Sequence, residues 1–251
     1  MNVQFFEAAD GIRIAWQEMG EGRPLLLVHG FFSDAQTNWI KYGHAKLLAD
    51  AGFRVIMPDL RAHGHSGKPH DASNYPKDVL ADDQFGLINH LNLEEFDIAG
   101  YSLGGRVVAR MLGRGCSPRR AIISGMGLQG LVNATARSSH FKHILDHLGA
   151  HEKGSPAWMA EAFLKTTNGD AVALRHVLET FQDTSETELQ SWDIPIAVIC
   201  GLDDNDNGSA SSLAQTLKHG KLIAVPGNHM SAVTRPELGQ AMVAALVGAA
   251  W

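Results

Sequence analysis

The stretch Phe96-Asp97-Ile98-Ala99-Gly100-Tyr101-Ser102-Leu103-Gly104-Gly105 decides the fold of this chain of 251 residues. A short apolar run ends in Gly-Tyr-Ser-Leu-Gly, and a helix-like run over 106–112 follows at once. A strand, a sharp turn and a helix, with serine at the turn, are the context in which a G-x-S-x-G match indicates a nucleophile elbow. We expect a strained backbone at Ser102, and glycine at positions 100 and 104 because a side chain there would clash. The pentapeptide alone also fits a simple Gly-Ser turn, so the rest of the chain has to decide.

The composition is that of an ordinary globular protein, with 45% hydrophobic and 19% charged residues and a net charge of −6. No basic block is present, so nucleic acid and anionic membrane surfaces are not expected as partners. Residues Met1–Glu7 lack the features of a signal peptide, and the longest apolar segment, 241–251, is too short to span a bilayer. Cys116 and Cys200 do not suggest a disulfide framework. A cytoplasmic location is expected by default.

Apolar runs alternate with helix-like segments along most of the chain. Strands are expected at 3–8, 12–18, 25–28, 53–58, 96–99, 121–124, 194–200 and 221–225. Helices are expected at 39–51, 75–90, 106–112, 209–217 and 236–249. Strands and helices that alternate with short connections predict a parallel sheet with helices on both faces, an α/β fold.

The alternation stops after Gly125. Between 126 and 191 only helix-like segments are found, at about 138–148, 156–166, 169–181 and 185–190. We therefore expect a core formed by 1–125 and 192–251, interrupted by a helical insertion at 126–191. The large apolar side chains of the insertion are expected to form its own core, and some of them to roof a site beneath it.

A serine hydroxyl becomes a nucleophile when a base takes its proton, and the base needs an orienting acid. In sheets of this kind, active residues lie on loops at the carboxyl ends of strands. The loop after the last predicted strand carries His229, and the loop before it carries Asp203, Asp204 and Asp206. The order Ser, Asp, His along the chain is that of α/β-hydrolases.

Five stretches, taken in order, make the chain resemble the α/β-hydrolase superfamily nearly end to end. They are His29-Gly30-Phe31, Asp59-Leu60-Arg61-Ala62-His63-Gly64-His65-Ser66, Gly100-Tyr101-Ser102-Leu103-Gly104-Gly105, Gly201-Leu202-Asp203-Asp204 and Gly227-Asn228-His229. The resemblance implies the α/β-hydrolase fold, a mostly parallel eight-stranded sheet flanked by helices, with a helical cap inserted after the sixth strand. It implies Ser102 as nucleophile, His229 as base and Asp204 as acid, since Asp204 matches the family's Gly-x-x-Asp spacing. Asp203 and Asp206 remain alternatives for the acid.

The same resemblance implies an oxyanion hole formed by the backbone N–H groups of Leu103 and Phe31. Substrate contacts are predicted for Phe32, Tyr101 and Trp158. Neither a cofactor nor a metal ion is expected, and a small-molecule substrate is the expected partner. The sequence does not indicate an oligomeric state.

Four patterns that suggest other ligands are given a structural interpretation. The loop with His63 and His65 lacks further metal ligands, and the face with His140, His143 and His147 is more commonly solvated. The G-x-G-x-x-G match at 125–130 lacks the helix and second strand of a dinucleotide site. The acidic run 203–208 lacks the final glutamate of a calcium loop.

The sequence thus predicts a serine hydrolase that cleaves a carboxylic ester, lactone or thioester of a small to medium apolar substrate through an acyl-enzyme. Two alternatives use the same three residues: hydrolysis of a C–C bond in a dienoic ring-cleavage product, and lyase chemistry like that of the menaquinone pathway. Dehalogenation and epoxide opening are disfavoured, because such relatives carry Asp where Ser102 stands. A ligand-sensing protein that keeps the fold is the alternative from a different class.

Overall fold

A mostly parallel sheet of eight strands organises the molecule, in the order β1-β2-β4-β3-β5-β6-β7-β8. The computed structural model describes residues 2–248, so the sequence predictions for Met1 and for 249–251 lie outside it. The strands are β1 (Gln4–Glu7), β2 (Arg13–Met19), β3 (Arg23–Val28), β4 (Phe53–Pro58), β5 (Asp97–Tyr101), β6 (Ala121–Ser124), β7 (Ile196–Gly201) and β8 (Gly220–Val225). β1 pairs antiparallel with β2 and β2 with β4, whereas all pairs from β4 to β8 are parallel. The predicted fold class is confirmed.

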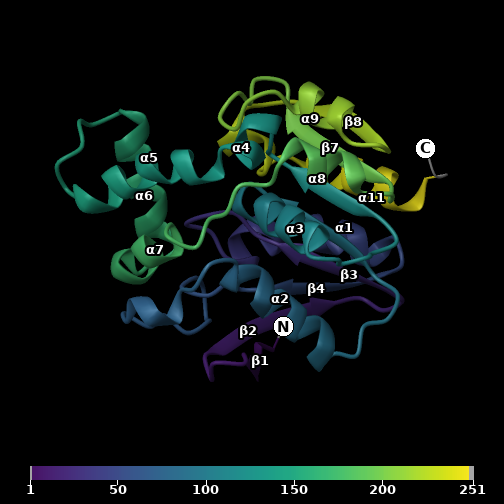
Figure 1. Cartoon of the computed structure of the whole chain (residues 1–251), viewed down its shortest axis with the longest axis horizontal. Coiled ribbons are helices and arrows are strands. Elements are labelled where there is room, and N and C mark those ends of the chain that lie inside the picture. Colours follow the sequence, from purple (N-terminus) through teal and green to yellow (C-terminus); the bar gives the residue numbers. More distant parts are fainter. Residues whose placement is uncertain (1, 249–251) are drawn as a thin grey trace.

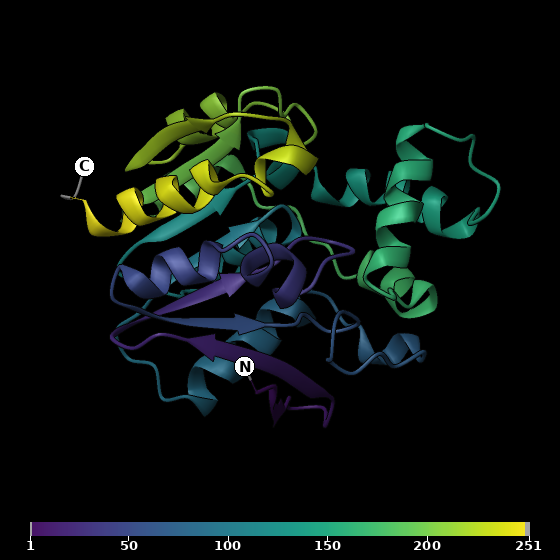
Figure 2. The ribbon, with the colours of Figure 1, turned by 180° about the vertical axis from the view of Figure 1, so that it is seen from behind.

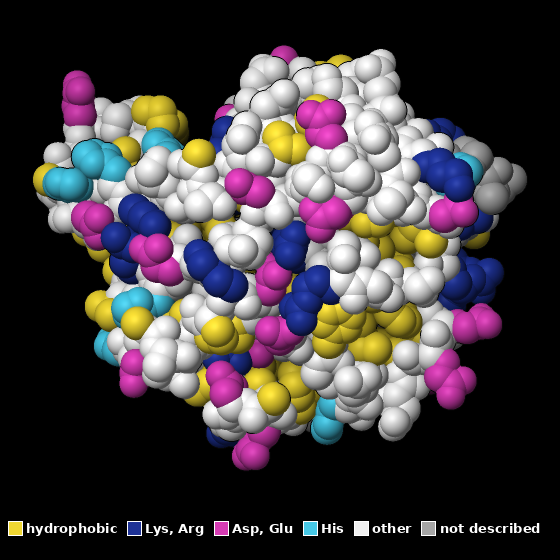
Figure 3. Space-filling view, viewed as in Figure 1, with side chains coloured by type: hydrophobic (Ala, Val, Ile, Leu, Met, Phe, Trp, Pro, Cys, Tyr) yellow, Lys and Arg dark blue, Asp and Glu magenta, His cyan; other side chains and the backbone are white. Residues whose placement is uncertain are grey.

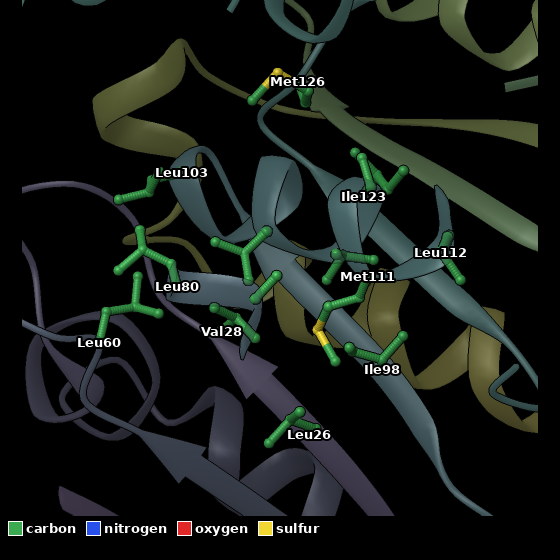
Figure 4. Packing of buried hydrophobic residues seen from close by; sticks show 14 of the residues in the cluster. Leu26, Val28, Leu60, Leu80, Ile98, Leu103, Met111, Leu112, Ile123 and Met126 are labelled. Atoms are coloured by element: carbon green, nitrogen blue, oxygen red, sulfur yellow. The ribbon is translucent and has the colours of Figure 1, made fainter. Parts of the chain in front are cut away.

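Helices cover both faces of the sheet, as Figures 1 and 2 show from opposite sides. On one face lie α1 (His44–Asp50) and α11 (Pro236–Val247), and on the other α2 (Val79–His90), α3 (Leu103–Gly113) and α9 (Ala210–Thr216). Successive side chains of a strand point to opposite faces. Leu25 and Leu27 of β3 therefore join the first core, and Leu26 and Val28 join the second, which Figure 4 shows in part. Burial on both faces explains why this strand is a continuous apolar run.

The segment between β6 and β7 is helical. It consists of α4 (Leu128–Val132), α5 (Ala134–Asp146), α6 (Pro156–Thr166), α7 (Ala171–Val177) and α8 (Glu186–Ser191). In Figure 1, α5, α6 and α7 project to one side of the sheet, and we call these three helices the cap. The hydroxyl of Ser155 accepts the N–H of Trp158, and Pro156 occupies the first turn, so α6 begins where its sequence predicts. The division into domains stays a prediction.

Two predicted helices have different limits in the structure. The helix expected at 39–51 is split into a π-helical turn, Gln36–Ile40, and α1, because Gly43 between them has φ of 80°. The helix expected at 75–90 begins at Val79, after Asp78 with φ of 61°. Sequence patterning overlooked α4 and the first turn of α5. Within residues 2–248 no helix is both long and apolar enough to cross a membrane, and the cytoplasmic location stays a prediction.

Candidate active site

The turn between β5 and α3 has the strained geometry expected for it. Ser102 has φ of 53° and ψ of −111°, and α3 begins at the next residue. A non-glycine residue in such a conformation costs about 1–3 kcal/mol, which the surrounding structure has to offset. A Cβ atom at Gly100 would overlap the backbone of Gly104, and one at Gly104 would overlap the carbonyl group of Val28. The expectation of glycine at both positions is confirmed.

Ser102, His229 and Asp204 form a chain of hydrogen bonds. Nε2 of His229 lies 3.0 Å from Oγ of Ser102, and Nδ1 lies 2.9 Å from Oδ2 of Asp204. A carboxylate only accepts, so Nδ1 carries the ring proton and Nε2 is free to accept the serine proton. This is the geometry that a serine nucleophile requires.

The acid is distinguished from its neighbours by burial. The side chain of Asp204 is 1% exposed, whereas Asp203 and Asp206 are exposed residues. Burial raises the pKa of Asp204, but the hydrogen bonds from His229 and from the N–H of Asp206 outweigh burial, so the pKa lies below its usual value. Asp204 is therefore ionised at neutral pH and can orient the imidazole.

A short helix holds His229 in place. α10 (His229–Ala232) begins at this residue, and Asn228 caps it by exchanging hydrogen bonds with Ser231. The hydroxyl of Tyr101 donates to the carbonyl of His229 at 2.6 Å. Burial raises the pKa of the Tyr101 phenol well above its usual value, so it stays protonated and keeps donating. Tyr101 thus supports the backbone of the histidine.

The two N–H groups predicted for the oxyanion hole lie beside the same serine. Leu103 is the first residue of α3, and Phe31 follows Gly30, whose N–H donates to Oδ1 of Asn38 at 3.0 Å. Within residues 2–248, neither the N–H of Leu103 nor that of Phe31 donates to a protein acceptor. Both are therefore available to a developing negative charge, and the role itself stays a prediction.

The loop after β4 supports the Phe31 segment through buried hydrogen bonds. Nε2 of His29 accepts the N–H of Leu60 at 2.9 Å, while its Nδ1 donates to the carbonyl of Gly30 at 2.8 Å. The carboxylate of Asp59 accepts the N–H groups of Ala35 and His65, each at 2.8 Å. These contacts accord with the structural interpretation of the loop.

Two cavities meet at Ser102. The smaller, about 160 Å³, is lined among others by Tyr42, Tyr101, Phe163, Met230 and Val233. The larger, about 470 Å³, lies between the cap, α3 and the loop after β7 and is lined among others by Arg106, Arg137, Phe141, Asp206 and Asn207. Ser102, Phe31 and His229 line both. Figure 3 shows a notch between the lobe of the cap helices and the rest of the molecule.

Two of the predicted substrate contacts are not at these cavities, and a third has another role. Phe32 is 2% exposed, packs against both Phe31 and Phe141, and has a φ of 60°. Trp158 is 38% exposed on α6 and lines neither cavity, whereas Phe163 of the same helix does. Tyr101 lines the smaller cavity, but its hydroxyl is committed to the backbone of His229.

Sequence reasoning missed three polar residues at the site. Asn38 holds the Phe31 loop, and its Nδ2, buried beside the smaller cavity, has no partner within residues 2–248. Arg106 and Arg137 line the larger cavity. Arg106 follows Ser102 by four residues, one helical turn, which is a signal that could have been used. Nothing local marks Asn38 or Arg137, because tertiary folding alone brings them to the cavities.

Two sequence patterns that could indicate other ligands, the acidic run 203–208 and the glycines of 125–130, lie among residues with other roles in the structure. Among the described residues, Asp204, Asp206 and His229 offer atoms within 4.8 Å of one another. A metal ion there would compete with the bonds of His229 to Asp204 and Ser102. The glycines of 125–130 allow close packing, since a Cβ at Gly127 would overlap the backbone of Gly208 and one at Gly130 the side chain of Met126.

Comparisons with known proteins agree with this geometry. The family model of the alpha/beta hydrolase fold matches residues 23–130. The chain is 30% identical to the non-heme chloroperoxidase CPO-A1 of Kitasatospora aureofaciens over 224 residues, 78% of this chain and 79% of that protein. It is 26% identical to a non-heme haloperoxidase of Rhodococcus erythropolis over 90% of this chain and 92% of that one. A hydrolase of Pseudomonas aeruginosa has a similar fold, with a TM-score of 0.80 at 19% identity over 99% of both chains. Together with the fold and the arrangement at the β5–α3 turn, these likenesses show that the chain belongs to the α/β-hydrolase superfamily.

Proposed function

We propose that this protein is a serine hydrolase that cleaves a carboxylic ester, lactone or thioester through an acyl-enzyme. The observation that carries the proposal is the chain of hydrogen bonds from Ser102 through His229 to the buried carboxylate of Asp204. A binding function alone does not require this arrangement. The predominantly apolar lining of the smaller cavity supports a substrate with at least one small apolar group.

In the first half of the reaction, Oγ of Ser102 attacks the acyl carbon while Nε2 of His229 takes the hydroxyl proton. The carbonyl oxygen becomes an oxyanion that faces the N–H groups of Leu103 and Phe31. When the intermediate collapses, His229 gives the proton to the leaving oxygen or sulfur, and the acyl group stays on Ser102.

In the second half, His229 takes a proton from water, and the resulting nucleophile attacks the acyl-enzyme. Collapse returns the proton to Ser102 and releases the carboxylic acid. Asp204 stabilises the imidazolium in both halves without itself being protonated.

The test is hydrolysis of p-nitrophenyl esters of increasing acyl length, together with labelling by a fluorophosphonate. We expect the unmodified protein to hydrolyse at least one ester, and Ser102→Ala to lower kcat by at least about a thousandfold. Ser191→Ala, at an exposed serine at the end of α8, is the control and should keep full activity. A protein that neither hydrolyses any ester nor takes the label would instead favour the ligand-sensing alternative.

A further inference from the structure

The larger cavity beside Ser102 contains two arginines that have no carboxylate partner. Several arginines elsewhere form close ion pairs: Arg61 binds Asp10 and Asp83, Arg110 binds Asp78, and Arg175 binds Asp146 and Glu179. Within residues 2–248, neither Arg106 nor Arg137 forms an ion pair. Burying a cation without a counter-ion costs free energy of folding. An arginine kept in such a position beside a cavity therefore indicates a functional role.

Arg106 is held so that part of its guanidinium group remains unused. The residue is 8% exposed on α3. Its Nε donates to the carbonyl of Gly130 at 2.9 Å and its Nη2 to Oδ1 of Asn207 at 3.1 Å, and its guanidinium lies over the ring of Phe181. Across the described part of the chain, Nη1 forms no hydrogen bond. Burial and the charge of Arg137 lower the pKa of Arg106 to about 10, so Arg106 remains a cation at neutral pH.

Arg137 approaches the same cavity from the cap. It lies on α5, and its Nε is buried without a hydrogen-bond acceptor in residues 2–248. The two arginines are close enough for the charge of one to affect the other, although they come from different elements. Like charges brought together in a partly desolvated cavity are stabilised when an anion lies between them.

We propose that Arg106 and Arg137 bind a carboxylate group of the substrate, so that the compound cleaved at Ser102 is anionic on one side of the scissile bond. This inference rests on the proposed hydrolase function, because it assigns the substrate class of the same site. Guanidinium groups recognise carboxylates with paired, charge-assisted hydrogen bonds. Asp206 also lines the cavity, so the same space contains a negative charge beside the two positive ones, which favours a monoanionic carboxylate over a dianionic phosphate.

The second cavity defines the other side of the substrate. With a volume of about 160 Å³ and aromatic and aliphatic walls, it accommodates a small uncharged group. The scissile bond then lies where the cavities meet, at Ser102 and His229. The carboxylate is placed either on the acyl group or on the leaving group, and the test includes both arrangements.

Two pairs of esters test the proposal. The p-nitrophenyl monoester of adipic acid is compared with p-nitrophenyl hexanoate, which has the same acyl length without the carboxylate. 4-Acetoxybenzoate is compared with its methyl ester, so that the charge lies on the leaving group. We expect the unmodified protein to have the higher kcat/KM for the charged ester in at least one pair.

Variants then show whether the arginines cause this preference. Arg137→Gln and Arg106→Gln should each lower the ratio of kcat/KM for the charged over the neutral ester by about tenfold or more. Arg175→Gln removes a cation from α7 that does not line the cavity, and should leave the ratio unchanged. Because Arg106 also donates hydrogen bonds to Gly130 and Asn207, thermal melting curves of Arg106→Gln are measured alongside its kinetics. If Arg106→Gln does not fold, the ratio of kcat/KM for the charged over the neutral ester in Arg137→Gln tests the proposal by itself.

A binding measurement separates failure of this inference from failure of the proposed function. Calorimetry with adipate and with 4-acetoxybenzoate on Ser102→Ala should show binding that weakens about tenfold or more when Arg137→Gln is added. Such binding in a protein that hydrolyses no ester would support the anion site while contradicting the hydrolase function. Equal kcat/KM ratios in the unmodified protein and both arginine variants, with no binding of either anion, would overturn the inference and leave ester hydrolysis standing.

Discussion

Three aspartates within four positions compete to orient His229, and burial distinguishes them. Asp204 places Oδ2 2.9 Å from Nδ1 of the histidine, while the side chains of Asp203 and Asp206 are on exposed residues. The N–H of Asp206 donates to Oδ1 of Asp204 at 3.1 Å, so the neighbour supports the acid through its backbone. A carboxylate fixed in this way stabilises the ring tautomer that leaves Nε2 free for the serine proton.

We therefore expect Asp204→Asn to lower kcat for ester hydrolysis by about a thousandfold to ten-thousandfold, since an amide favours the wrong histidine tautomer. Asp203→Asn is the matched control and should remain within about twofold of the unmodified protein, as for a surface residue. Steady-state kinetics on one p-nitrophenyl ester measures both. A mild effect at position 204 together with a large one at 203 or 206 would show that the acid has been misassigned.

The junction of β5 with α3 depends on the close approach of three backbone segments. A Cβ atom at Gly104 would overlap the carbonyl groups of Val28 and His29 at the end of β3. That contact brings the first turn of α3 against the strand that leads to the Phe31 loop. The nucleophile and the proposed oxyanion donors are thus positioned by one packing contact between elements.

Gly104→Ala should destabilise the protein by about 3 kcal/mol, because backbone cannot move aside as a flexible side chain can. Gly113→Ala is the control on the same helix, where the added Cβ would lie 3.2 Å from Oε1 of Glu188, at the end of a flexible side chain. It should be neutral or stabilising by up to about 1 kcal/mol. Chemical denaturation gives both values, and equal effects of the two substitutions would contradict the packing account.

The elements that local pattern and fold rules determine could be predicted from the sequence. The strand Phe53–Pro58, the helix Pro156–Thr166 and the glycines around Ser102 follow from hydrophobic pattern and sterics. The sequence was not sufficient where long-range packing decides. The inward turn of Phe32 and the orientation of Trp158 depend on contacts that no local pattern contains. The same is true of Arg137, which reaches the cavity only because the cap folds over it.

Several histidines are enclosed in the molecule as neutral groups. Burial lowers the pKa of His29, His44 and His63, and it does so most for His63. His44 shows how such a residue ties the fold together, since its Nε2 donates to the carbonyl of Val233, at the end of the helix that carries His229. In the unfolded chain these side chains are exposed and regain the ordinary value of 6.5.

Because the folded pKa values lie below 6.5, the unfolded state binds more protons as the pH falls, and the fold loses stability. Between about pH 7.5 and pH 6 a histidine that stays neutral in the folded state contributes a loss of at most about 0.8 kcal/mol, so the three together contribute at most about 2.4 kcal/mol. Burial raises the pKa of Asp83 to about 6 despite its pairing with Arg61. Protonation of Asp83 therefore offsets part of the loss near pH 6 and more of it at lower pH, so the comparison ends at pH 6. Urea unfolding at the two pH values measures the loss.

His44→Gln, which keeps a donor for Val233, should reduce that loss by about a third, since one of the contributing groups is removed. The comparison is between the losses of the variant and of the unmodified protein over the same pH interval. A loss that is unchanged in His44→Gln, or stability that rises toward pH 6, would show that these histidines are not buried as neutral groups.

The proposed mechanism requires that Ser102 carries the acyl group between the two halves of the reaction. It is tested most directly by quenching turnover of p-nitrophenyl hexanoate in acid and mapping the modified peptide by mass spectrometry. We expect a hexanoyl group on the peptide that contains Ser102, and neither this modification nor hydrolysis above background in Ser102→Ala. Rapid hydrolysis by Ser102→Ala, or a hexanoyl group bound to a different residue of the active protein, would contradict it.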